Sequence, residues 1–262
     1  MASSDGAVLL QPTFPEDIER TINEALLRDD RDMCSTMSLV ASRFNIWTKP
    51  IALHTVIVRR RDNWMERVRH CLLPNAGFMR ILALDMRSSE IWRRVPLPSE
   101  ELALIRKLLE ASERVAHLAV TWNIWSDLQH DCGPSLADLQ YPAALRDLTV
   151  YAPPDLINPN PFRRWPQEYL PATDQCPNIE NITYAVNRLP GYMPYFTDRC
   201  KWCMIVVLDR TEPYKDDAEK ILQFKESEPN LSFQYIQHWH QVLGEWVAKM
   251  EGRESLLIHP RI

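Results

Sequence analysis

A six-residue apolar pattern recurs along the chain and constrains the fold more than any other feature of the sequence. Apolar residues occupy its first, fourth and sixth positions, as in Leu53-x-x-Val56-x-Val58. Successive copies start 26, 36, 30, 34 and 23 residues apart, at Met79/Leu82/Leu84, Val115/Leu118/Val120, Leu145/Leu148/Val150, Ile179/Ile182/Tyr184 and Trp202/Ile205/Val207. The alternation at the fourth and sixth positions is typical of a strand with one buried face. Six such strands at a roughly regular spacing predict a repeat array.

The segments between the copies supply return elements for such an array. Residues 61–72 and 99–112 carry apolar side chains at helical spacing, and Ser99 is placed to cap the second of these helices. A strand followed by a return segment, repeated with parallel pairing, is the leucine-rich-repeat layout. The intervals exceed the usual repeat length, and 152–177 holds seven prolines, too many for a return helix. We therefore predict an α/β fold over residues 51–262, an irregular leucine-rich-repeat-like solenoid of parallel strands with outer helices and loops.

Residues 14–50, which precede the array, have apolar residues at helical spacing instead of strand spacing. Residues 1–13 before them are expected to be a flexible N-terminus. Pro15 suits a first helical turn, and the apolar residues that follow it at helical spacing are Ile18, Ile22 and Ala25 or Leu26. A second helix would place five apolar side chains on one stripe, namely Met33, Met37, Val40, Phe44 and Trp47. Pro50 disfavours helical geometry at Lys49, so we expect the second helix to end there.

The C-terminal part is expected to close the structure. The segment "SFQYI" at 232–236 has the character of a further strand. Helical spacing then continues in an aromatic-rich face made of Trp239, Val242, Leu243, Trp246, Val247 and Met250. Because the terminal units of a solenoid must be covered, we expect a helix over 237–251 to cap the open end of the sheet.

Charge and glycine content exclude several classes of function. Thirty Lys and Arg against 35 Asp and Glu give a net charge of −5, so no overall positive field would attract nucleic acid or an anionic membrane. Six glycines form neither a dinucleotide-binding nor a phosphate-binding loop. The N-terminus lacks the pattern of a signal peptide, and no segment is apolar enough to span a membrane. We expect a cytoplasmic or nuclear protein with reduced cysteines and no cofactor.

Two local clusters suggest chemistry without establishing it. Cys200 and Cys203 form half of a zinc site that His238 and His240 could complete, but two histidines separated by two positions diverge on a helix. Cys132 follows His130 and Asp131, yet adjacency along a chain does not hold a base against a nucleophile. We expect no metal site and no catalytic residue. The sequence favours the absence of a catalytic activity of its own but leaves this question open.

The N-terminal segment resembles a known family. "IERTINEAL", "MSLVASRFNIW" and "KPIALHTVIV" are similar to the F-box-like start of basidiomycete F-box and leucine-rich-repeat-like proteins, and "ALRDLTV", "CPNIENITY" and "HWHQVLGEWVAKMEG" are similar in style to their repeats. The resemblance implies a substrate receptor of an SCF-type ubiquitin ligase, whose helical segment binds a Skp1-like adaptor. The residues that would bind this partner are Phe14, Pro15, Ile18, Ile22, Met37, Val40, Phe44 and Trp47.

The repeat strands would present their other face to an unknown substrate protein. The residues of this expected substrate face are Arg59, Asp85, His117, Thr121, Asp147, Thr149, Tyr151, Asn181 and Thr183. An alternative remains open, because aromatic residues in proline-rich stretches such as "PFRRWPQEYLP" could line a pocket over residues 152–200. In that case the same scaffold would bind or convert a hydrophobic small molecule.

Overall fold

The computed structural model divides the chain into two compact units, Met1–His54 (unit 1) and Thr55–Ile262 (unit 2). It describes residues 15–30, 33–61, 63–86, 97–121, 124, 128, 141–151, 178–186, 202–208, 226, 231–236, 239–253 and 255. The expected flexible segment at 1–13 lies outside these ranges. None of the helices in these ranges has the length and apolar character needed to cross a membrane.

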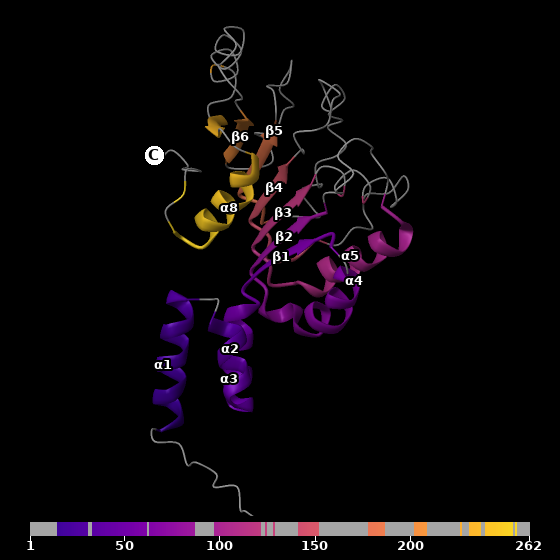
Figure 1. Ribbon diagram of the computed structural model, residues 1–262. Helices are drawn as coiled ribbons and strands as arrows, with labels where there is room; N and C mark the ends of the chain where they lie inside the picture. Colours follow the sequence, from indigo (N-terminus) through magenta and orange to yellow (C-terminus); the bar gives the residue numbers. More distant parts are fainter. Residues whose placement is uncertain are drawn as a thin grey trace, which may run out of the picture. The chain divides into compact units, whose positions relative to one another are not determined.

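The described part of unit 1 consists of the helices α1 (Glu16–Asp29), α2 (Met33–Val40) and α3 (Ser42–Ala52) (Figure 1). The sequence predicted one continuous second helix, but Ala41 has extended backbone angles (φ −157°, ψ 155°) and separates α2 from α3. The predicted end before Pro50 is also wrong, because α3 includes Pro50 and ends at Ala52. Near the end of a helix, a proline removes one hydrogen bond, and the Leu53 N–H still donates to the Lys49 carbonyl at 2.9 Å.

Unit 2 is built on a parallel sheet whose strands follow one another in chain order. In the described ranges the sheet has seven strands, ordered β1 to β7 and parallel at every pairing. Their bounds are β1 (Thr55–Arg59), β2 (Ile81–Asp85), β3 (His117–Thr121), β4 (Asp147–Tyr151), β5 (Asn181–Val186), β6 (Trp202–Leu208) and β7 (Leu231–Ile236). The prediction of an α/β fold with parallel strands at the six apolar patterns is confirmed, and "SFQYI" lies in β7.

The register places equivalent pattern positions side by side over most of the sheet. The fourth position of the pattern pairs across β1 to β5, from Val56 to Leu82, Leu118, Leu148 and Ile182. At β6 the alignment shifts by two residues, because Ile205 pairs with Tyr184 rather than with Ile182. A shift of two keeps each side chain on its original face, so the apolar pattern cannot reveal it.

One side of the sheet carries the return segments. After β1 come α4 (Trp64–Arg67), a π-helical turn η1 (Val68–Leu72) and a 3-10 segment η2 (Leu73–Phe78), and α5 (Ser99–Ala111) precedes β3. The apolar face predicted for 99–112 is confirmed, since Leu102, Ile105, Leu108 and Leu109 are buried. Ser99 does not cap α5, because Pro98 occupies the cap position and no side chain caps the helix.

The other side of the sheet is covered by α8 (Trp239–Met250), which lies opposite α4 and α5 (Figure 1). Its Leu243, Trp246 and Val247 form one buried cluster with residues of β2, β3 and β5, namely Ile81, Ala83, Ala119 and Ala185. The helix predicted over 237–251 therefore exists, but the expectation that it caps the open end of the sheet is corrected. The small side chains of Ala83, Ala119 and Ala185 leave room for a helix on this face.

Candidate functional site

Unit 1 exposes a set of large apolar side chains, which we call the apolar surface of unit 1. Its members are Ile18, Ile22 and Leu26 of α1, Leu39 and Val40 of α2, and Ile46 of α3. Ile22 is 55% exposed, Val40 62% and Leu39 87%. Large apolar side chains that stay exposed together on one small folded unit are candidates for burial against another protein.

Helical geometry shows which side of α1 carries its exposed apolar side chains. Ile18, Ile22 and Leu26 are separated by four residues and lie on one side of α1. The buried residues of α1 are Asn23 and Leu27, each one position further along the chain, which rotates them by about 100° from the stripe. The apolar stripe of α1 therefore lies beside the buried face of the helix rather than on it.

The structure separates the residues expected to bind the Skp1-like partner into two groups. Pro15, Ile18, Ile22 and Val40 are exposed, whereas Met37 and Phe44 are half-buried. Trp47 is 8% exposed and contacts Phe44 edge to face, with 5.2 Å between the ring centroids. Trp47 thus belongs to the core of unit 1, and Phe14 lies outside the described residues.

Unit 2 carries a polar row at the first positions of three neighbouring strands. His117, Asp147 and Asn181 pair across β3, β4 and β5. The Asn181 amide donates a hydrogen bond to Asp147 Oδ1 at 2.5 Å, and His117 Nδ1 lies 2.7 Å from Asp147 Oδ2. The imidazole is not oriented for a hydrogen bond to this carboxylate, although the two groups are in contact.

The polar row meets the C-terminal end of α8. Burial lowers the pKa of Lys249 from 10.5 to about 8, while the nearby Asp147 carboxylate favours the charged amine and opposes this shift. Beyond the helix, Glu251 Oε1 accepts a hydrogen bond from the Thr55 hydroxyl of β1 at 2.6 Å, and Arg253 lies 2.7 Å from Glu251 Oε2. These polar contacts connect the end of α8 to both β1 and β4.

Several residues of the expected substrate face are buried rather than presented to a partner. Asp85, Thr121, Thr149 and Thr183 are each at most 6% exposed. Arg59 is exposed and its Nε lies 3.6 Å from Asp85 Oδ2, which makes the two an ion pair at the ends of β1 and β2. Asp147 is also buried, at 9% exposed, and the side chain of Tyr151 lies outside the described residues. Of the described residues of this face, Arg59, His117 and Asn181 retain accessible polar groups.

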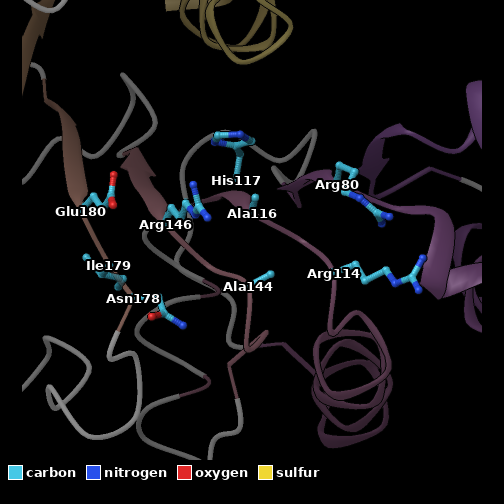
Figure 2. Close-up of a pocket in the computed structure, with 9 residues that line it drawn as sticks. All are labelled: Arg80, Arg114, Ala116, His117, Ala144, Arg146, Asn178, Ile179 and Glu180. Carbon is cyan, nitrogen blue, oxygen red and sulfur yellow. The ribbon is translucent and has the colours of Figure 1, made fainter.

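A groove of about 660 Å³ lies beside the polar row, where the chain enters β2 to β5. Figure 2 shows the side chains that line it, among them Arg80, Arg114 and Arg146 around the small side chains of Ala116 and Ala144. Its other lining residues are His117, Asn178, Ile179 and Glu180. Asn178 is held in place by a hydrogen bond of 2.9 Å from its amide to the Ala143 carbonyl.

The sequence interpretation missed this groove, although the repeat pattern contains the signal. The second position of successive patterns is Arg80, Ala116, Arg146 and Glu180. Backbone hydrogen bonds place these residues in one row, because Arg146 N–H donates to the Ala116 carbonyl and Glu180 N–H to the Arg146 carbonyl. Aligning the patterns position by position would have brought the arginines together.

Most residues of the cysteine and histidine clusters singled out from the sequence lie outside the described ranges. His130, Asp131, Cys132, Cys200 and His238 lie outside the described residues, as does most of the aromatic-lined pocket considered over 152–200. Among the residues that are described, no three histidine, cysteine, aspartate or glutamate side chains are grouped so that they could hold a metal ion.

Comparison with protein families, curated proteins and solved structures finds no match for this chain.

Proposed function

We propose that this chain is a protein-interaction adaptor, an F-box-like substrate receptor whose unit 1 binds a Skp1-like adaptor of an SCF-type ubiquitin ligase. The observation that carries the proposal is the apolar surface of unit 1. Six large aliphatic side chains on three short helices stay exposed while the core of the same unit is filled by other residues. Burying such a surface against a partner removes apolar area from water, and this supplies the main driving force for association.

The repeat architecture of unit 2 is part of the same proposal. We infer that unit 2 is an irregular leucine-rich-repeat-like solenoid. Strand order that follows chain order, with parallel pairing throughout the described sheet, supports this interpretation. In doubly wound sheets the strand order reverses at a switch point, whereas stacked repeats add each strand beside the previous one. Because α8 packs on the centre of one sheet face, a substrate protein would contact the polar row, the groove or the segments between strands.

Binding of the purified chain to a fungal Skp1 protein, measured by isothermal titration calorimetry, tests the proposal. We expect wild-type binding, and a loss of at least tenfold in affinity for Ile22→Lys and for Val40→Lys. Both side chains are more than half exposed, so a lysine there should leave unit 1 folded. Trp47 is unsuitable as a test site, because replacing a buried aromatic residue would unfold the unit.

Phe78→Lys provides the matched control, since Phe78 is an exposed apolar residue of unit 2 (39%). It should bind as the wild type does, and circular dichroism should show equal helix content in all variants. Absence of binding by the wild type, or equal binding by Ile22→Lys, would contradict the proposal.

A further inference from the structure

We propose that the groove at the entrance to strands β2 to β5 binds a small organic phosphate monoester. This inference goes beyond the adaptor function and does not depend on it, because it concerns a different surface on unit 2. The recognising groups would be Arg80, Arg114 and Arg146, and the site lies at the groove shown in Figure 2.

The first argument is that two of these arginines lack the acidic partners that most other described arginines have. Arginine ion pairs are formed elsewhere by Arg20, Arg28, Arg43, Arg59, Arg60, Arg69 and Arg253. Within the part of the chain that the structure describes, Arg114 and Arg146 have no hydrogen bond or ion pair from their guanidinium groups. In a chain of net charge −5, unpaired arginines gathered at one groove are notable.

The second argument is the arrangement of the three arginines. Arg80 and Arg146 hold equivalent places before β2 and β4, separated by the strand that follows Ala116. Their Cα atoms are therefore roughly 10 Å apart, at about 4.8 Å per strand. In Figure 2, Arg80 and Arg114 lie on one side of Ala116 and Ala144, and Arg146 lies on the other, so an anion in the groove would have positive charge on both sides. Three arginines against one glutamate leave the lining with net positive charge.

The third argument concerns the ligand. A guanidinium presents paired N–H donors that match the oxygens of a phosphate group, which favours phosphate over a single carboxylate where several arginines meet. The side chains of Ala116, Ala144 and Ile179 give the groove an apolar part that could contact the organic body of the ligand. Its volume of about 660 Å³ exceeds that of a bare phosphate and falls in the range of small-molecule sites.

The choice of test residues follows from their contacts. The Arg80 guanidinium donates to the Gly77 and Met79 carbonyls at 3.0 Å, so its removal would also disturb the turn before β2. Arg114 and Arg146 are exposed and can be changed without loss of a described contact. Arg67 is an exposed arginine outside the groove, and Arg67→Gln is therefore the charge-matched control.

Calorimetric titration of the full chain with β-glycerophosphate, at low ionic strength, tests the proposal. We expect saturable binding by the wild type and by Arg67→Gln, a loss of about tenfold in affinity for Arg114→Gln and for Arg146→Gln, and no detectable binding by the double variant. Glycerol, which lacks the charge, should not bind. No binding by the wild type, or equal weakening in Arg67→Gln, would overturn the proposal.

A further titration with a phosphoserine-containing pentapeptide identifies the source of the phosphate. Tighter binding than β-glycerophosphate, lost in the double variant, would indicate that the phosphate is carried by a polypeptide. Equal or weaker binding would indicate a free small molecule. Because no Skp1 protein is present in either titration, failure here is independent of the adaptor proposal.

Discussion

Replacement of Trp246 by alanine tests whether α8 is part of the core of unit 2. Trp246 is 1% exposed and lies in the cluster with Ile81, Ala83 and Ala119. A buried tryptophan removes about 200 Å² from water, which corresponds to about 5 kcal/mol at 25 cal/mol per Å². Its Nε1–H is buried with no hydrogen-bond partner among the described atoms, and such a group costs about 1–3 kcal/mol. We therefore expect Trp246→Ala to lower the free energy of unfolding by about 2–4 kcal/mol, measured by urea denaturation.

Two companion variants separate packing from a general loss of side-chain volume. Trp246→Phe keeps most of the ring and removes the unpaired N–H, so it should cost less than about 2 kcal/mol. Ala119→Leu adds volume to the face that α8 covers, and overpacking there should cost about 1–3 kcal/mol. The same change at the exposed Ala111 should stay within about 0.5 kcal/mol.

The double variant of Trp246→Ala and Ala119→Leu gives the decisive result. The added leucine can occupy the cavity that the tryptophan leaves, so the combined loss should fall short of the sum of the single losses by at least about 1 kcal/mol. If Ala119→Leu is neutral and the two changes are additive, α8 does not pack on this face and the reasoning is wrong.

Two further predictions concern the contacts at the end of α8. Lys249 has a pKa of about 8 in the folded protein, against 10.5 for the ordinary amine. Between these pH values the unfolded chain therefore binds more protons than the folded protein does. The contribution of Lys249 to the free energy of unfolding should accordingly increase as pH rises from 8 to 10.5. Lys249→Met should remove that increase, and urea midpoints of the two proteins across this pH range would show it, whereas parallel curves would refute it. Thr55→Val removes the hydrogen bond to Glu251 and should cost about 1–2 kcal/mol in urea unfolding, while Thr21→Val, at an exposed helical hydroxyl, should change stability by less than about 0.5 kcal/mol. Equal effects of the two threonine changes would show that the contact between β1 and Glu251 contributes little.

The helices and strands of this protein were largely predictable from local sequence pattern. The residues at which the helices begin and end were not. The alternation around Val56, Leu82, Leu118 and the later copies located the strands, because every second residue of a strand faces the same side of the sheet. The same alternation did not show that β2 is buried on both faces. Helix ends depended on weaker preferences. Ala41 interrupts a stripe that sequence alone reads as continuous, and Pro50 lies within α3 despite the expectation that the helix ends before it.

Part of the candidate sites could be predicted from the sequence, and the part that depends on contacts between distant segments could not. Ile18, Ile22 and Val40 were singled out from helical spacing and are exposed, but spacing could not show that Trp47 belongs to the core. An apolar side chain on a stripe can serve either the core or a partner, and only the neighbouring helices decide which. The groove was missed because its arginines are distant in sequence and meet only through the strand register.

Strand positions, the parallel α/β class and the amphipathic helices follow from local pattern, since each depends on periods of two or 3.6 residues within a short window. The position of α8 on the sheet face, with Ala83, Ala119 and Ala185 beneath it, follows from packing between distant segments. The structure alone also fixed the two-residue shift of β6, because such a shift leaves every side chain on the same face and changes only its neighbours. Contacts between distant segments follow from packing, which no local period encodes.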